Sequence, residues 1–212
     1  MGTYGYIIIF VVVLVVAVFI WAQAFKAMKK TSKIRRETMA KMDRIKNLSN
    51  RYATLISDDL AEISDADLFD AVIIRIWKKL GKEDEELENF RALSAEEKNI
   101  YTAWYIREEV TNDGVSAYFR NCGNALSELS EDVMATLGLN TLDVVLKQAC
   151  RMFDENTEVS CSKNDIKFID LEFRAAYNAE EYSAAAANYI KANADKFIDS
   201  DDALVELDVP EE

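Results

Sequence analysis

The stretch EEVTNDGVSAYFRN, residues 108–121, holds the side chains that look most like a site. Two carboxylates lead into a polar Asn-Asp-Gly turn, and an aromatic pair with two further polar residues follows it. Its candidate site residues are Glu109, Asn112, Gly114, Tyr118, Phe119 and Asn121. Asparagine and glycine suit a tight turn, and an aromatic pair just beyond it can wedge between helices. We therefore expect a structural junction first, a binding surface second and a reaction centre last.

The rest of the chain offers little for catalysis. It contains no histidine, which removes the commonest general base and the commonest zinc ligand. No carboxylate pair is marked as held in a cleft, as a two-carboxylate hydrolase requires. The acidic DSDDALVELD segment lacks the glycine and spacing of an EF-hand. The three cysteines, Cys122, Cys150 and Cys161, show no CxxC spacing and indicate idle thiols in a reducing compartment. We expect no catalytic residue, cofactor or metal.

The charge is divided unevenly along the chain. The overall net charge is −13, but residues 1–51 carry ten Lys/Arg against two Asp/Glu, a net of +8. Residues 52–212 carry the other 15 basic and 36 acidic residues, a net of −21. That exceeds the charge of about 2–8 that solubility asks of a small domain. The candidate acidic binding surface comprises Glu83, Asp84, Glu85, Glu86, Glu88, Glu128, Glu131 and Asp132. Taken alone, each cluster is better explained as a solvated helix face or loop.

An apolar run near the N-terminus predicts a membrane anchor. Residues 3–25 are uncharged, with Tyr6–Trp21 as the apolar centre, and about 34 Å of helix would cross a bilayer core of about 30 Å. The nearby positive charges all follow the run, so residues 26–212 are expected in the cytoplasm and the N-terminus outside the cell membrane. A cleaved signal peptide ending at Ala22-Gln23-Ala24 is the rival. It is disfavoured because no Lys or Arg precedes the run and the run is long.

The remaining sequence predicts an all-α protein. There is one proline and there are six glycines, too few turn residues for a sheet protein of this size. We expect a single transmembrane helix over 1–25 and a basic helical stalk over 26–60. A cytoplasmic multi-helix bundle over 61–198 and an acidic flexible tail over 199–212 follow. Ile45, Leu48, Tyr52 and Leu55 form an apolar seam on the stalk, either to dock on the bundle or to make a dimer contact.

Local signals predict where the helices of the bundle begin and end. Asp65 is expected to cap a helix that Gly81 stops, and Ser94–Glu97 forms a capping box for a helix reaching Val110. Gly138 ends another helix, Thr141 caps the next, and a helix follows over 166–177. Asn178–Glu181 is a second capping-box pattern before a last helix through Ala194. Gly81, Gly114 and Gly138 are expected at positive φ.

Residues 66–198 resemble the DNA-mimic protein family, also catalogued as domain of unknown function 4375. One motif reads Glu109-Val110, Asn112-Asp113-Gly114-Val115, Tyr118-Phe119 and Asn121. A second is Gly138-Leu139 before TLDVVLKQACRMF, and the third joins Ile169-Asp170-Leu171-Glu172-Phe173 with Tyr189-Ile190-Lys191-Ala192-Asn193. Asp113, Val115 and Leu139 depart from the family's glycine, phenylalanine and alanine. The residues of the family's turn are therefore only partly present in this chain. The predicted membrane anchor is an addition to the family's domain.

The resemblance implies an all-helical, often dimeric acidic domain without a catalytic centre, named after a member that imitates DNA. Carboxylates at i, i+3 and i+4 on a helix offer spacing comparable to the charge of duplex DNA, about one per 1.7 Å. We therefore expect a membrane-anchored, non-enzymatic module that engages a basic protein, for example a DNA-binding protein, by charge mimicry and binds no nucleic acid itself. The alternative is a membrane-tethered scaffold that forms a homodimer and whose acidity serves solubility. A hydrolase is the least favoured class.

Overall fold

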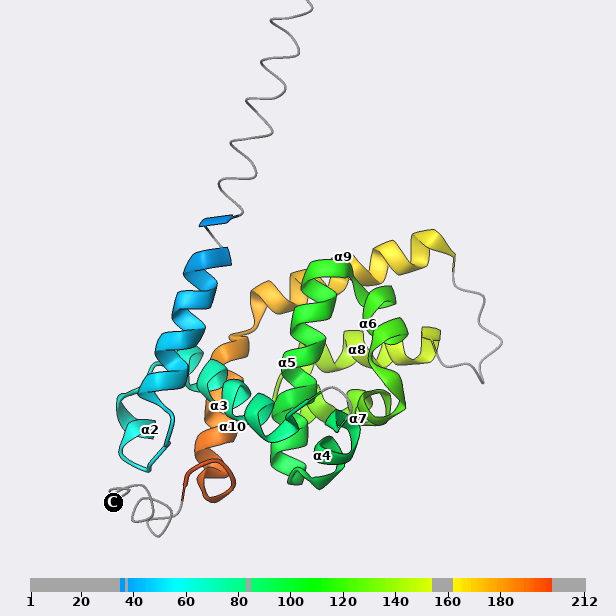
Figure 1. Ribbon diagram of the computed structural model, residues 1–212. Coiled ribbons are helices and arrows are strands. Elements are labelled where there is room, and N and C mark those ends of the chain that lie inside the picture. Colours follow the sequence, from blue (N-terminus) through cyan, green and yellow to red (C-terminus); the bar gives the residue numbers. More distant parts are fainter. Residues whose placement is uncertain (1–34, 37, 83–84, 154–161, 200–212) are drawn as a thin grey trace, which may run out of the picture. The chain divides into compact units, whose positions relative to one another are not determined.

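The computed structural model describes residues 35–36, 38–82, 85–153 and 162–199. Contacts divide the chain into two units, Met1–Asn47 and Leu48–Glu212. Residues 38–47 of the first unit are helical, and the regular structure described in the second unit is helical throughout (Figure 1). The all-α prediction is therefore confirmed for these residues. Among them, no helix combines the length and apolarity that a membrane span needs. The predicted anchor, Tyr6–Trp21, lies outside the described residues.

The second unit is a bundle in which α5 is central (Figure 1). Its helices are α2 (Asp59–Glu62), α3 (Asp65–Leu80), α4 (Glu86–Ala92), α5 (Ala95–Asp113), α6 (Val115–Asn121), α7 (Gly123–Thr136), α8 (Asn140–Phe153), α9 (Lys163–Ala179), α10 (Tyr182–Ala192) and the 3-10 turn Ala194–Lys196. Helix α5 packs against α3, α6, α7, α9 and α10, while α7 packs on α8, α8 on α9 and α10 on α3. Ile100, Ala103, Ile106 and Val110 recur at helical spacing and are buried, which explains why α5 occupies the core.

Side chains within three positions cap the starts of α3, α5 and α9, and the sequence predicts the cap of α5 correctly. The capping box is confirmed: Ser94 accepts from the Glu97 N–H, and the Glu97 side chain accepts from the Ser94 N–H. Helix α3 is capped by Ser64 rather than by Asp65, which is the first helical residue. Helix α9 begins at Lys163, earlier than expected, because Ser162 makes a capping box with Asp165.

The start of α8 is a correction. The predicted cap, Thr141, lies inside the helix, and the carboxylate of Glu180 supplies the cap instead. It accepts hydrogen bonds from the backbone N–H groups of Thr141 at 2.7 Å and Leu142 at 3.2 Å. The second predicted capping box is wrong for the same reason. Asn178 belongs to α9, which runs to Ala179, and Glu180 is turned toward α8 rather than toward the helix that follows it.

The end of the described chain is tied to the start of the second unit. The Asp199 N–H donates to the Leu55 carbonyl at 2.8 Å, and the Asp199 carboxylate accepts from the Leu55 N–H at 3.0 Å and from Arg75 at 2.6 Å. Arg75 also donates to the carbonyl of Ala53 at 2.9 Å. Partial burial opposes ionisation of Asp199, but Arg75 and the Leu55 N–H hold the pKa of this carboxyl below its ordinary value. The predicted tail therefore starts from an anchored residue. Leu48, Tyr52 and Leu55 of the apolar seam are buried within this unit.

Candidate functional site

The predicted junction is a sharp helix-to-helix turn at Gly114. This glycine ends α5 and precedes α6 with φ of 88°, in the left-handed region that favours glycine. The first N–H of α6, from Val115, donates to the Asp170 carboxylate of α9 at 2.7 Å. Two of the motifs singled out in the sequence thus meet at one turn. Gly81 and Gly138 also have positive φ, 71° and 79°, as predicted.

The aromatic pair after this turn is largely internal. Tyr118 is fully buried, and its hydroxyl is hydrogen-bonded to Ser130, which in turn donates to the Leu126 carbonyl at 2.7 Å. Burial raises the pKa of Tyr118 above its ordinary value. The ring of Phe119 stacks on Phe153 of α8, with centroids 5.0 Å apart and planes 14° from parallel. These two residues stabilise the junction, so they are poor candidates for contact with a partner.

The polar residues of the junction motif reach the surface beside α5. Exposed Asn121 donates from its side-chain amide to the Glu109 carboxylate at 2.9 Å, and its own carbonyl accepts from the Tyr105 hydroxyl at 3.3 Å. Burial, and then the nearby carboxylates of Glu109 and Glu86, raise the pKa of Tyr105. Asn112, two residues before Gly114, is exposed and has no side-chain hydrogen bond among those described.

Glu86 links the predicted acidic surface to this motif. Its carboxylate accepts from the Tyr101 hydroxyl at 3.2 Å, across from α4 to α5. Burial and then Glu86 raise the pKa of Tyr101. Residues 101, 105 and 109 are successive i, i+4 positions on one face of α5. We call Glu86, Tyr101, Tyr105, Glu109 and Asn121 the tyrosine–glutamate strip. It is the feature that brings members of both predicted residue sets together.

Further aromatic rings contact the tyrosines of the strip. Trp104 of α5 contacts Tyr101 at 5.6 Å and Tyr105 at 6.2 Å between centroids, and meets Trp77 edge-on at 5.0 Å. Trp77 is 36% exposed and Trp104 is half-buried, so part of this aromatic surface faces solvent. Sequence reasoning missed Tyr101, Trp104 and Tyr105. Their i, i+3 and i+4 spacing, running into Glu108 and Glu109, was the signal that could have found them.

The other predicted acids lie elsewhere. Glu83 and Asp84 fall outside the described residues, while Glu85 and Glu88 are exposed at the start of α4. Glu128, Glu131 and Asp132 are exposed on α7, and Asp132 lies 3.7 Å from Lys147 of α8. Within the described ranges, no group of three or more Cys, Asp or Glu side chains is arranged to hold a metal ion. Cys122 and Cys150 are free thiols, and burial raises the pKa of Cys150 to about 11.

Comparison with known proteins changes the expected family. The sequence model of the DMP19-like protein family matches residues 91–199, about half of the chain. The expected membership in the family catalogued as domain of unknown function 4375 is therefore wrong, and the match begins at residue 91 rather than 66. The motifs behind that expectation include Gly114, Tyr118 and Phe173, which serve a turn and a core and so report packing needs. No curated protein and no solved structure matches the chain.

Proposed function

The chain belongs to the DMP19-like protein family, and from the site of this member we propose that it is a non-enzymatic binding module for a basic protein. The observation that carries the proposal is the tyrosine–glutamate strip. Glu86 lies on α4 and Glu109 on α5. They accept hydrogen bonds from Tyr101 and Asn121, and after burial their negative charges help to raise the pKa of Tyr105. Two carboxylates are therefore gathered around one aromatic surface, and this arrangement is more specific than a high count of acids.

Such a surface suits the side chains of lysine and arginine. A guanidinium or ammonium group can pair with the carboxylates of Glu86 and Glu109 while its flat or apolar part lies on Tyr105 and Trp104. Cations over aromatic faces gain about 0.5–1 kcal/mol at exposed sites, in addition to the ion pair. The hydrogen bonds of Tyr101 and Asn121 to these same carboxylates hold them in place, so less side-chain entropy is lost on binding.

We also propose that residues 3–25 anchor the module in the cell membrane with the bundle in the cytoplasm. The support is the uncharged apolar run followed by ten Lys/Arg before residue 52. A reporter that is active only in the cytoplasm should work when fused after Glu212. An externally accessible C-terminus, or cleavage after Ala24, would contradict the anchor without touching the binding proposal.

Binding of a defined cationic peptide to the full chain tests the module. An arginine-rich peptide is the probe, measured by titration against the wild type and against Glu86→Gln with Glu109→Gln. We expect the double variant to bind about tenfold more weakly, since it loses two ion pairs of up to about 1 kcal/mol each. Glu128→Gln with Glu131→Gln on α7 is the matched control, and we expect it to change affinity less than twofold. If both double variants lost the same affinity for the peptide, only the total charge would matter. If neither lost affinity, the proposal would be refuted.

A further inference from the structure

The tyrosine–glutamate strip offers different contacts to the two common basic side chains. We propose that it selects arginine over lysine, so that the partner it fits presents arginine. This inference rests on the proposed function, because it concerns the same surface, but it makes a claim that binding of a cation alone does not. Two features of the strip carry it, the row of hydrogen-bond acceptors and the partly exposed aromatic rings.

The tyrosine hydroxyl protons of the strip are used inside the molecule. Tyr101 is buried and donates to one oxygen of Glu86, which it holds in place. Tyr105 is half-buried and donates to the backbone carbonyl of Asn121 at 3.3 Å. Burial, and then the charges of Glu109 and Glu86, raise the pKa of Tyr105, so this hydroxyl keeps its proton at neutral pH. A hydroxyl that donates its proton can still accept, so the Tyr105 oxygen is an acceptor for a ligand.

The two carboxylates are positioned by neutral groups. Tyr101 donates to Oε1 of Glu86, and the Asn121 amide donates to Oε2 of Glu109 at 2.9 Å. Elsewhere in the described bundle, hydrogen-bonded carboxylates either serve a helix start or pair with Lys or Arg. The second oxygen of each strip carboxylate accepts from none of the described residues. With the Tyr105 hydroxyl, these oxygens form a row of acceptors along one side of α5.

Arginine matches a row of acceptors better than lysine does. A guanidinium has five N–H donors in one plane and no acceptor, so it can donate to a carboxylate and to a neighbouring hydroxyl at the same time. A lysine ammonium is a compact, strongly hydrated charge whose three donors leave from one point. Both side chains can form an ion pair with the strip, but arginine satisfies more of its acceptors.

The aromatic rings beside these acceptors add to the preference. Trp104 and Tyr105 are half-buried and Trp77 is 36% exposed, so part of their ring surface is open to a ligand. The plane of Trp104 stands at 81° to Trp77 and at 64° to Tyr105, so the rings face in more than one direction. A guanidinium is flat and weakly hydrated, and it can stack on one ring while its N–H edge reaches the acceptors. An ammonium group would have to give up more strongly bound water for the same contact.

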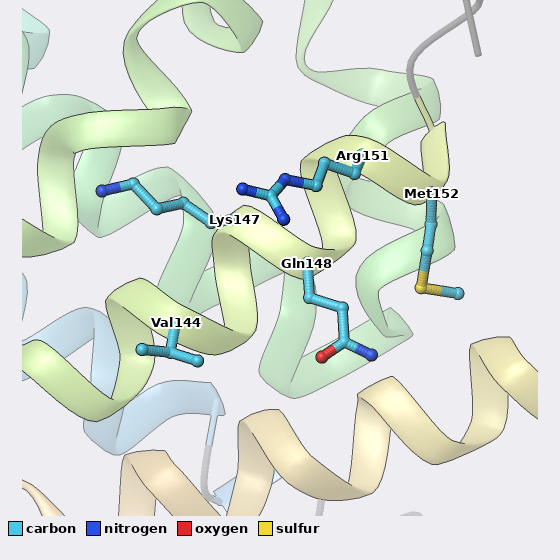
Figure 2. Close-up of a pocket in the computed structure, with 5 residues that line it drawn as sticks. All are labelled: Val144, Lys147, Gln148, Arg151 and Met152. Carbon is cyan, nitrogen blue, oxygen red and sulfur yellow. The ribbon is translucent and has the colours of Figure 1, made fainter.

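A groove on α8 does not compete for this ligand. The groove has a volume of about 450 Å³ and is lined by Val144, Lys147, Gln148, Arg151 and Met152 (Figure 2). The charged side chains among these five residues are both basic, so a cationic peptide gains no ion pair with them. Binding of such a peptide therefore reports on acidic surfaces and not on this groove.

Two peptides of equal length and charge test the selection, one with arginine and the other with lysine as its only basic residue. By calorimetric titration of the full chain, we expect the arginine peptide to bind about tenfold more tightly than the lysine peptide. If both peptides bound with equal affinity, the selection would be overturned, while the proposed function would stand. If neither peptide bound, both proposals would be overturned.

Two variants locate the selection on the strip. Trp104→Leu removes ring surface, and Tyr105→Phe removes the hydroxyl acceptor but keeps the ring. We expect each to lower the preference for the arginine peptide from about tenfold to about threefold, because arginine loses one contact that lysine does not make. Tyr177→Phe, at a half-buried tyrosine of α9 outside the strip, is the matched control and should keep the full preference. A tenfold preference that persisted in both strip variants would overturn the assignment of the selection to the strip.

Discussion

The carboxylate of Asp170 lies directly against Gly114, although 56 positions separate them in the chain. A Cβ atom at Gly114 would stand 3.0 Å from both carboxylate oxygens, closer than side chains normally approach. The same carboxylate accepts from the Val115 N–H, one of the donors that the start of α6 leaves without an intrahelical partner. Gly114 therefore has two roles. It permits the positive φ of the turn and leaves room for the cap that α9 supplies.

Replacing Gly114 should consequently cost more than replacing a glycine with positive φ alone. Gly138 is the matched control, because its φ is 79° and nothing lies within 4 Å of an added Cβ. We expect Gly138→Ala to lower the free energy of unfolding by about 1 kcal/mol, through backbone strain. Gly114→Ala should lower it by about 1 kcal/mol more, because the methyl group displaces Asp170 and weakens the cap. Chemical denaturation measures both, and equal losses would show that Asp170 moves aside freely.

The cap of α8 makes a second prediction, in which the residue that the sequence favours is the wrong one. Glu180→Ala should lower the free energy of unfolding by about 1 kcal/mol, the usual cost of losing an N-terminal cap. Thr141→Ala should change it by less than about 0.5 kcal/mol, since Thr141 is exposed and its side chain makes no described cap bond. Thermal melting of the two variants side by side decides the matter. A larger loss for Thr141→Ala would restore the cap expected from the sequence.

These cases indicate what the sequence can and cannot predict here. The Ser94 capping box and the three glycine stops involve residues within about four positions of each other, and the sequence predicts them. The Asp170 cap joins residues 55 positions apart, the Glu180 cap 39, and the Arg75–Asp199 pair 124. Such contacts exist only once the bundle has formed, so no local sequence pattern predicts them.

The candidate site also depends on contacts between helices that form only when the bundle is assembled. One motif indicates Glu109 and Asn121, and a run of acids indicates Glu86. The sequence does not indicate that all three lie near Tyr105. Tyr101 and Tyr105 connect them because Glu86 of α4 accepts a hydrogen bond from Tyr101 of α5, 15 positions along the chain. Composition predicted the all-α class, since that class depends on propensities summed over many residues.

Glu97 gives a prediction about pH. Burial opposes its ionisation, but hydrogen bonds from Lys79 at 2.5 Å and from Ser94 outweigh burial and hold the pKa of Glu97 below its ordinary value of 4.5. A lowered pKa in the folded state stabilises the fold above about pH 4.5, and the contribution is lost as the pH falls through the lowered value. Glu97→Gln should therefore reduce the free energy of unfolding by about 1 kcal/mol near neutral pH and by less in acid.

Unfolding measured from about pH 7 to pH 3 checks this, with Glu88→Gln as the control at an exposed acid of α4. The control should follow the wild type across the range within about 0.5 kcal/mol. If Glu97→Gln kept the same deficit at every pH, the capping geometry rather than the charge of Glu97 would be responsible for it.

The last prediction concerns how the tyrosine–glutamate strip captures a cation. Exposed charges attract a partner over about a Debye length, which falls from about 10 Å at 0.1 M salt to about 3 Å at 1 M. Binding of the arginine-rich peptide should therefore weaken with salt, mainly because its association slows. The aromatic contacts of Trp104 and Tyr105 are short-range and act after encounter. Trp104→Leu should thus speed dissociation about threefold while leaving association and its salt dependence as in the wild type. Stopped-flow kinetics at two salt concentrations resolves the two rates. If Glu86→Gln with Glu109→Gln changed only dissociation, or Trp104→Leu only association, this division of roles between the carboxylates and the rings would be wrong.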